Sequence, residues 1–268
     1  MTEYDRHGPV VVGIDGSRAA IHAAQWAIDE AVDRNVPLCL VHVTRIAIST
    51  KSFADEYRID KEYAETSLRE AASAVKATGK PVKLDCIIRH GLAGKALIDE
   101  SRNASLVCVG SEGVGRLAGA FFGSTATEVA KRAHCLVAVV CRPESGSDTR
   151  QLWIAVAVNE PGESDAAIDC AMQEGRMRRL PVLAVGTWQE DMGEHPYDKL
   201  DHRVEALRER YRDVRIYPVT TPADLGRFLK NSDEPVSIAV VRRADIGHVI
   251  HTRPSPGRGE RTLLIVRD

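Results

Sequence analysis

The sequence predicts an α/β protein made of two tandem doubly wound domains, each with a five-stranded, mainly parallel sheet that carries helices on both faces. Three observations lead to this prediction. Short apolar runs alternate with segments of helical periodicity, the same succession occurs twice along the chain, and a glycine-rich stretch at 110–125 lies between an apolar run and a helical segment. Strands separated by helices require right-handed crossovers, and these produce a parallel sheet covered on both sides.

The first repeat begins at residues 10–14, a continuous apolar run that suits a strand buried on both faces. Gly16 and Ser17 end this run, and Ser17 is a suitable N-cap for a helix. Small apolar residues then recur on one stripe at helical spacing, which predicts a helix at 18–34. The same criteria predict further strands at 38–43, 82–89, 105–109 and 136–140, and further helices at 55–77, 94–103 and 124–133.

The second repeat aligns with the first without a gap where residues 10–43 match 154–187 at a constant offset of 144. The offset falls to 132 at residues 106–109 and to 126 at 136–140. The second repeat therefore lacks twelve residues between its second and third strands and six in the glycine-rich region. Seven positions are identical: Val12/Val156, Ala23/Ala167, Ala27/Ala171, Glu30/Glu174, Arg34/Arg178, Pro37/Pro181 and Val41/Val185.

These offsets also define the domains. We assign residues 1–142 to the first domain, 143–150 to a linker and 151–268 to the second domain. The linker is rich in residues that favour turns or extended chain, and it contains few apolar residues that a core would need.

Composition and charge limit the classes of function. The chain of 268 residues is 44% hydrophobic and 28% charged, as is usual for globular proteins. Its 36 basic and 38 acidic residues leave a net charge of −2, which does not provide the basic field that non-specific nucleic-acid binding needs. The apolar runs are too short to span a membrane, and residues 1–7 contain no apolar export signal. We expect a cytoplasmic protein that binds neither nucleic acid nor membrane.

The cysteines and histidines do not form a recognisable catalytic or metal-binding group. Six cysteines occur singly, without a Cys-x-x-Cys pair or a histidine at zinc spacing, so we expect small buried residues. A redox or metal site could involve only Cys135 and Cys141. His42, His90 and His134 have no nucleophile and carboxylate near them in the sequence, and we expect structural histidines with satisfied hydrogen bonds.

The glycine-rich stretch has the features of a phosphate-binding loop. Gly110, Gly113 and Gly115 permit positive φ angles and a close approach of the main chain to a ligand, so that amide groups can point at an anion. Ser124 and Thr125 follow at the predicted start of a helix, where free N–H groups and the helix dipole favour a phosphate. The stretch is neither a Walker A loop nor a dinucleotide fingerprint. A glycine-rich surface loop without a ligand is the alternative.

The glycine spacing Gly-x2-Gly-x9-Gly-Ser at 110–124 resembles the ATP-binding signature of the universal stress protein family. Residues 11–17 (VVGIDGS), 37–43 (PLCLVHV) and 134–140 (HCLVAVV) resemble the first, second and last strands of the same family. The resemblance covers residues 8–142. It implies a Rossmann-like fold and a protein that binds ATP, often as a dimer, in stress responses.

The resemblance further implies a set of nucleotide-binding residues: Gly13, Asp15, Val41, Gly110, Ser111, Gly113, Val114, Gly115, Arg116, Gly123, Ser124 and Thr125. Asp15 would face the ribose or a Mg²⁺ ion that arrives with the phosphates, although an acid that offsets a helix dipole is the alternative. The main chain of Val41 would meet the adenine edge. Arg116 is either a cation beside the phosphates or a solvated loop side chain.

The second repeat has lost this signature. The replacements are Asp15 by Asn159, Gly16 by Glu160, Gly110 by Arg242 and Gly113 by Asp245. We therefore expect one ATP per chain. The second domain can pack against the first as a second subunit would, which gives a pseudo-dimer within one chain, and a homodimer of two chains is a further possibility.

The sequence thus predicts an ATP-binding regulatory protein of the stress response, in which the nucleotide controls contact with an unidentified regulatory protein partner. Because no general base is evident, we expect binding without appreciable turnover, and no enzyme. Two alternatives are an interaction scaffold that needs no nucleotide and a slow ATPase.

Overall fold

The architecture is taken from a computed structural model of the chain. The structure describes residues 8–44, 53–111, 122–141, 152–158, 165–187, 196–222, 224–250 and 261–267. The chain divides into two compact units, Met1–Arg142 and Pro143–Asp268, and each is described by itself. The predicted linker at 143–150 lies outside the described residues.

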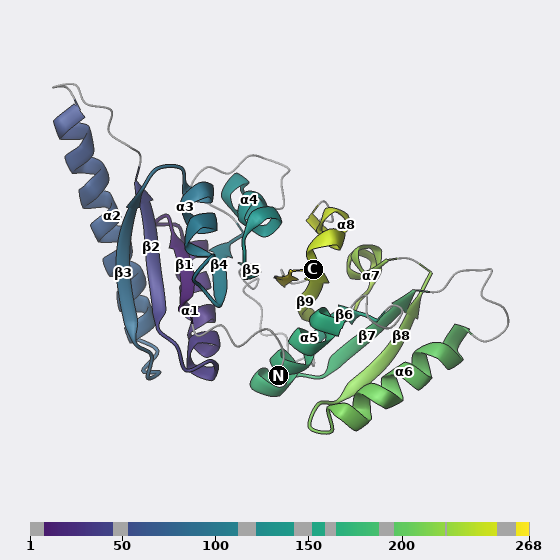
Figure 1. Cartoon of the computed structure of the whole chain (residues 1–268). Helices are drawn as coiled ribbons and strands as arrows, with labels where there is room; N and C mark the ends of the chain where they lie inside the picture. Colours follow the sequence, from purple (N-terminus) through teal and green to yellow (C-terminus); the bar gives the residue numbers. More distant parts are fainter. Residues whose placement is uncertain are drawn as a thin grey trace. The chain divides into compact units, whose positions relative to one another are not determined.

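The first unit contains a parallel sheet with the strand order β3-β2-β1-β4-β5 (Figure 1). Its strands are β1 (Val10–Ile14), β2 (Leu38–Thr44), β3 (Leu84–His90), β4 (Leu106–Gly110) and β5 (Leu136–Val140). Its helices are α1 (Arg18–Asp33), α2 (Phe53–Lys76), α3 (Ala93–Glu100) and α4 (Ser124–Arg132). Every strand and helix predicted for this repeat is present, with ends that differ by a few residues.

Two helices cover each face of this sheet. Helices α1 and α2 pack against each other and against β1, β2 and β4, whereas α3 and α4 pack together on the opposite face (Figure 1). Right-handed crossovers dictate this arrangement, since α1 and α2 connect strands toward β3 while α3 and α4 lead back toward β5. The order reverses between β1 and β4, so the carboxyl ends of these strands form the switch point at which such sheets bind ligands.

The small side chains in the core explain why α1 lies close to the sheet. Every residue of β5 is buried, and β1, β2 and β4 each contain a single residue that is only partly buried. The face of α1 that covers them consists of small side chains, including Ala20, Ala23, Ala24 and Ala27. Because alanine adds little bulk between helix and sheet, the helix backbone can approach the strands closely.

The second unit repeats the same fold. Its parallel strands have the order β8-β7-β6-β9-β10. They are β6 (Trp153–Ala157), β7 (Val182–Thr187), β8 (Ile216–Thr221), β9 (Val236–Arg242) and β10 (Thr262–Val266). The helices are α5 (Asp165–Arg178), α6 (Pro196–Arg210), α7 (Leu225–Asn231), the 3₁₀ turn η2 (Arg243–Asp245) and α8 (Ile246–Ile250). The predicted offsets are confirmed, because β3 and β8 differ by 132 residues and β5 and β10 by 126.

A buried ion pair occurs at the same place in both units. Arg34 lies 3.1 Å from Glu30 near the end of α1, and Arg178 lies 2.8 Å from Glu174 near the end of α5. The side chains of Glu30 and Glu174 are 0% and 1% exposed, whereas their arginines retain 16% and 15% exposure. These four residues are among the identities that the repeat alignment identified, and they have the same structural role in each unit.

The chain turns in the same way after each of these pairs. Asn35 and Arg179 occupy equivalent positions with φ angles of 52° and 56°, in the left-handed region that ends many helices. The carbonyl of Pro37 then accepts a hydrogen bond from the N–H of Val10 on the neighbouring strand, at 2.9 Å. The corner between the first helix and the second strand is therefore a duplicated structural element.

Two further features concern the helices. The short helix α8 directly follows β9 and η2, and the sequence did not predict it because it lies where the shortened second repeat has no aligned counterpart. Among the described residues, no helix combines the length and the apolar composition that a membrane span requires.

Replacing Arg34 by methionine should destabilise the first unit, because Glu30 would keep its buried position without the Arg34 cation. Removing one partner of a buried ion pair costs about 3–5 kcal/mol, and the partial exposure of Arg34 places the expected loss at about 3 kcal/mol. Equilibrium urea unfolding measures it.

The exposed pair of Lys61 and Glu65, 3.8 Å apart, provides the control. Lys61→Met should change the free energy of unfolding by less than about 1 kcal/mol. Equal losses in the Arg34 and Lys61 variants would contradict the structural importance of the buried pair.

Candidate functional site

A cavity of about 520 Å³ lies in the first unit at the carboxyl ends of β1, β2 and β4, beside the switch point of the sheet. Cavities that bind small ligands have volumes of roughly 300–1,000 Å³. Mostly apolar side chains line this one, together with a few polar groups, as is usual for ligand sites.

The cavity brings together residues that are far apart in the sequence. Seven of the twelve predicted binding residues line it: Gly13, Asp15, Val41, Gly110, Gly123, Ser124 and Thr125. Gly113, Val114, Gly115 and Arg116 lie outside the described residues. That these residues contact a nucleotide stays a prediction.

Ser111 does not line the cavity. It is 3% exposed, its N–H donates to the carbonyl of Val140 at 2.9 Å, and its carbonyl accepts from the N–H of Gly123 at 3.0 Å. The two bonds join the end of β5, the end of β4 and the start of α4. Ser111 therefore fixes the chain on either side of residues 112–121, and the structure gives its backbone this anchoring role.

The start of α4 faces the cavity without a side-chain cap. Gly123 is the N-cap, and the predicted helix start at Ser124 is confirmed. The first intrahelical bond runs from the N–H of Thr127 to the carbonyl of Gly123, at 3.0 Å. The preceding N–H groups, of Ser124, Thr125 and Ala126, have no acceptor within the helix, and all three residues line the cavity. This end of the cavity therefore suits an anion.

The turn from β1 to α1 forms another wall. Ser17 is confirmed as the N-cap, since its hydroxyl accepts from the N–H of Ala20 at 3.1 Å. The carboxylate of Asp15 accepts from the N–H of Ser17 at 2.9 Å, and the carbonyl of Asp15 accepts from the Tyr63 hydroxyl at 3.0 Å. Gly16, with φ 84°, allows this tight turn. Asp15 thus supports the helix start and also lines the cavity, so both roles considered for it are compatible.

The geometry favours Val43 over Val41 for a main-chain contact. The carbonyl of Pro37 points at β1, where it accepts from Val10, and in a parallel strand every second carbonyl points to the same side. The carbonyls of Val41 and Val43 therefore also point toward β1. Val41 is paired within the ladder, whereas Val43 lies beyond the end of β1 and lines the cavity. Val43 therefore has the main-chain carbonyl that is left outside the ladder, and the adenine contact of Val41 stays a prediction.

Packing accounts for two of the lining glycines. Gly110 is not among the described glycines with a positive φ, so it does not serve the conformational purpose expected from the sequence. A Cβ atom at Gly110 would lie 2.8 Å from the carbonyl carbon of Ala19 and 3.0 Å from the nitrogen of Ala20, in the first turn of α1. A Cβ atom at Gly13 would lie 2.8 Å from Cδ1 of Leu97. Both glycines allow helices to pack closely beside the cavity.

His42 differs from the expected satisfied histidine. It is 6% exposed, its ring meets that of Tyr63 edge-on with centroids 5.8 Å apart, and it lines the cavity. Its buried Nδ1 has no hydrogen-bond partner among the described residues. Burial lowers the pKa of His42 below its ordinary 6.5, against the opposing effect of the Asp15 and Asp60 carboxylates. The imidazole is therefore neutral at pH 7.

The other two histidines lie apart from the cavity. Nδ1 of His90 is 2.6 Å from the hydroxyl of Thr44, as expected for a structural histidine. The main-chain N–H of His134 donates to the hydroxyl of Ser101 at 2.8 Å.

Sequence reasoning missed several lining residues. Val43 and Ala93 could have been found from topology, because Val43 is the last residue of the strand predicted at 38–43, Ala93 follows the strand predicted at 82–89, and both strands finish at the same edge of the sheet. Tyr63 gave no such signal, since it lies within the long charged helix α2, and Leu97 resembled an ordinary core residue of α3.

All six cysteines lie in the described parts of the chain, none of them forms a disulfide bond, and five are buried as expected. Cys86 is exposed, because it lies on the edge strand β3. Burial, with a smaller effect of nearby carboxylates, raises the pKa of Cys39 to about 11, so its thiol stays protonated. Cys135 and Cys141 lie just outside the two ends of β5. No group of three or more metal-binding side chains occurs in the described parts of the chain.

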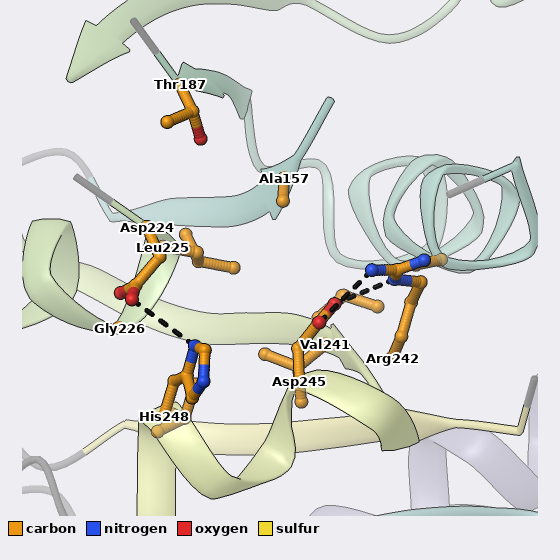
Figure 2. Close-up of a pocket in the computed structure, with 12 residues that line it drawn as sticks. Ala157, Thr187, Asp224, Leu225, Gly226, Val241, Arg242, Asp245 and His248 are labelled. Atoms are coloured by element: carbon orange, nitrogen blue, oxygen red, sulfur yellow. Dashed lines mark hydrogen bonds and ion pairs between the residues drawn. The ribbon is translucent and has the colours of Figure 1, made fainter. Parts of the chain in front are cut away.

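The second unit has a smaller cavity, of about 170 Å³, at the corresponding edge of its sheet (Figure 2). Arg242 and Asp245, which replace two signature glycines, both line it. Nε and Nη2 of Arg242 donate to the Asp245 carboxylate at 2.7 and 3.1 Å. An ion pair therefore occupies the positions at which the first repeat has glycines.

A second pair lies across this cavity. Nδ1 of His248 in α8 is 3.3 Å from the carboxylate of Asp224, which also caps α7 by accepting from the N–H of Arg227 at 2.9 Å (Figure 2). A Cβ atom at Gly226 would lie 2.6 Å from the carbonyl oxygen of His248, so α7 and α8 are in close contact. Asn159 and Glu160 lie outside the described residues.

The fold, the cavity and the glycine signature together define a class of protein, and comparisons with known sequences identify the same class. The model of the universal stress protein family matches residues 7–141. The chain therefore belongs to this family, as its motifs suggested.

Particular relatives extend the match to the whole chain. Universal stress protein Rv2624c of Mycobacterium tuberculosis is 41% identical over 263 residues, which cover 96% of each chain. Rv2028c of the same organism is 33% identical over 279 residues, or 99% of this chain and 98% of the relative. The crystal structure of a universal stress protein from Archaeoglobus fulgidus has a TM-score of 0.72 at 16% identity, over 98% of this chain and 97% of that one, which shows the tandem fold.

Replacing Gly110 by alanine should destabilise the protein even without a ligand, because the new methyl group would displace the first turn of α1. Overpacking of this kind costs about 1–3 kcal/mol, measurable by urea unfolding. Gly247→Ala is the control: its Cβ atom meets nothing within 4 Å, and in α8 it should be neutral or stabilising by up to about 1 kcal/mol. Unchanged stability of Gly110→Ala would indicate that this glycine serves a ligand alone.

Acid should weaken the fold partly through His42. Between its lowered pKa and 6.5, the unfolded state binds more protons at this residue than the folded state does, so stability decreases as the pH falls through that window. Above it the ring is neutral in both states and contributes no pH dependence. His42→Phe should therefore lose less stability than the wild type between about pH 7 and pH 5 in urea unfolding. Identical losses would contradict the neutral buried ring.

Proposed function

We propose that the first unit binds one ATP molecule per chain and that the protein acts through nucleotide-dependent contact with a regulatory protein partner. The observation that carries the proposal is the start of α4, which has no side-chain cap and whose first three residues, with N–H groups that have no acceptor within the helix, line the cavity at the switch point of the sheet. The glycine signature at 110–124 supports the same ligand.

The cavity suggests one orientation for the nucleotide. The phosphates would lie at Ser124 and Thr125, where N–H groups and the helix dipole favour negative charge. The carbonyl of Val43 would accept a hydrogen bond from the adenine amino group, and Asp15 would accept one from the ribose. The reverse orientation would bring a polyphosphate beside the Asp15 carboxylate, which is repulsive. Mg²⁺ would neutralise phosphate charge and needs few protein ligands.

We further propose binding without turnover. The titratable side chains among the described lining residues are Asp15, which directly follows β1, His42 on β2 and Tyr63 on α2. Helix α4 packs against β5, on the other side of β4. Since neighbouring strands are about 4.8 Å apart, roughly 10 Å separates β2 from β4. The His42 imidazole on β2 would therefore not reach a water at the terminal phosphate.

The chain provides a route from occupancy to a partner. The bond between Gly123 and Ser111 fixes the chain on both sides of residues 112–121, a segment that contains predicted phosphate contacts at 113–116. A bound nucleotide would therefore contact this segment, and we propose that the segment presents the nucleotide-dependent surface to a partner in the cytoplasm. The second unit, or a second chain, would contribute surface rather than nucleotide.

Replacing Ser124 by aspartate tests the phosphate site without weakening the helix. An acid in the first turn stabilises a helix by about 0.3–1 kcal/mol, so the melting temperature should be kept or raised. The same charge would repel the phosphates, and ATP affinity in titration calorimetry should fall at least about tenfold. Mass spectrometry of protein purified without added nucleotide should detect ATP in the wild type and little in this variant.

Gln25→Glu adds the same charge at an exposed position of α1 outside the cavity and should bind ATP as the wild type does. Unchanged affinity of Ser124→Asp would remove α4 from the site. No binding to the wild type would favour the nucleotide-independent scaffold, and steady phosphate release that Ser124→Asp abolishes would favour the slow ATPase.

A further inference from the structure

His42 combines three properties that its surroundings do not explain. It is more than nine-tenths buried, it lines the cavity, and its Nδ1 has no partner among the described residues. A polar atom buried without a hydrogen bond costs free energy, so such a residue needs another reason to be present. An apolar side chain in its place would pack against Tyr63 without that cost.

The surroundings of the ring determine which nitrogen carries the proton. Neutral imidazole has one N–H donor and one acceptor nitrogen. A proton on Nδ1 would be buried without an acceptor, so we assign it to Nε2. Because Nδ1 is closed off from solvent, Nε2 is the nitrogen that remains to face the cavity. His42 therefore offers the cavity a neutral hydrogen-bond donor.

An acceptor lies next to this donor. His42 on β2 is opposite Ile14 on β1, and Asp15 is the next residue. Both His42 and Asp15 line the cavity, and the Asp15 charge acts on the histidine ring. A carboxylate accepts hydrogen bonds and an N–H donates them, so the two groups together complement a pair of neighbouring hydroxyls. One hydroxyl can donate to Asp15 while the oxygen of the other accepts from His42.

We propose that His42 is a further ligand-contacting residue of this site, which together with Asp15 binds the two ribose hydroxyls and so selects ribonucleotides over deoxyribonucleotides. This inference rests on the proposed function, because it requires a nucleotide in the cavity. A site that hydrogen-bonds a hydroxyl discriminates strongly against an analogue without it, since its buried polar groups are then left unpaired.

The proposed orientation agrees with this assignment. Phosphate at this end would be repelled by Asp15, whereas at α4 it meets free N–H groups. The base edge is assigned to the carbonyl of Val43, one residue beyond His42 on the same strand. Side chains of successive strand residues point to opposite faces, so His42 approaches the ligand from the α2 side, where Tyr63 holds the ring.

The test compares the dissociation constants of ATP, 2′-deoxy-ATP and 3′-deoxy-ATP by titration calorimetry. Wild type should bind ATP at least about tenfold more tightly than one or both deoxy analogues. His42→Phe keeps an aromatic ring but removes the donor, so ATP affinity should fall about tenfold while binding of the disfavoured analogue hardly changes. His42→Gln places an amide N–H near the position of Nε2 and should restore part of the preference.

His90→Phe is the matched control, since His90 is bonded to Thr44 and does not line the cavity. It should leave all three affinities unchanged. ATP binding with an undiminished ribose preference in folded His42→Phe would overturn the inference and leave the proposed function intact. Absence of binding by the wild type would overturn the proposed function itself, and the ribose role with it.

Discussion

The structure depends on the close approach between the first turn of α1 and the end of β4. A side chain at position 110 would collide with the backbone of Ala19 and Ala20, so the helix start can lie there only above a glycine. This contact places the Asp15 turn on one side of the cavity and leaves the carboxyl end of β4 open on the other. The ligand cavity is thus a consequence of how the helix packs on the sheet. In the second unit the corresponding residue is Arg242, whose side chain pairs with Asp245 beside a much smaller cavity.

The two units are alike at the amino-terminal edge of their sheets and differ at the carboxyl-terminal edge. Near the amino ends of the strands both retain a buried Glu–Arg pair and a left-handed residue after the first helix. Changing one member of such a pair leaves a buried charge, which costs several kcal/mol in either unit. At the carboxyl ends of the strands the two units differ, because the first has the larger cavity and the second has the Arg242–Asp245 ion pair.

The fold of the first unit could be predicted almost completely, because buried parallel strands and amphipathic helices leave strong periodic patterns in the sequence. The repeat offsets located the strands of the second unit as well, but not α8, since it occupies a region where the alignment had no counterpart. Site prediction was less complete. Gly13, Asp15 and Ser124 line one cavity at the carboxyl edge of the sheet, as the motifs suggested. Three features could not be predicted, because residue type and spacing do not encode them. The carbonyl of Val43 is left outside the ladder because β1 ends early, and a glycine is needed at 110 because α1 lies close by. Whether Nδ1 of His42 has a hydrogen-bond partner depends on the residues packed around the ring.

Charge pairing distinguishes the cavity of the second unit from that of the first. The cavity of the first unit has separated polar groups: uncapped N–H donors at α4 and a carboxylate beside a neutral imidazole at the β1 and β2 ends. In the second unit the polar groups are paired with each other, Arg242 with Asp245 and His248 with Asp224. A guanidinium held by two bonds to a carboxylate attracts a polyphosphate weakly, because the net charge of the pair is zero. A polyphosphate could attract Arg242 strongly only if the ion pair separated, which costs free energy. The cavity of about 170 Å³, against about 520 Å³ in the first unit, leaves less room for a ligand whose contacts could offset this cost. The difference between the units therefore follows from two substitutions that satisfy each other.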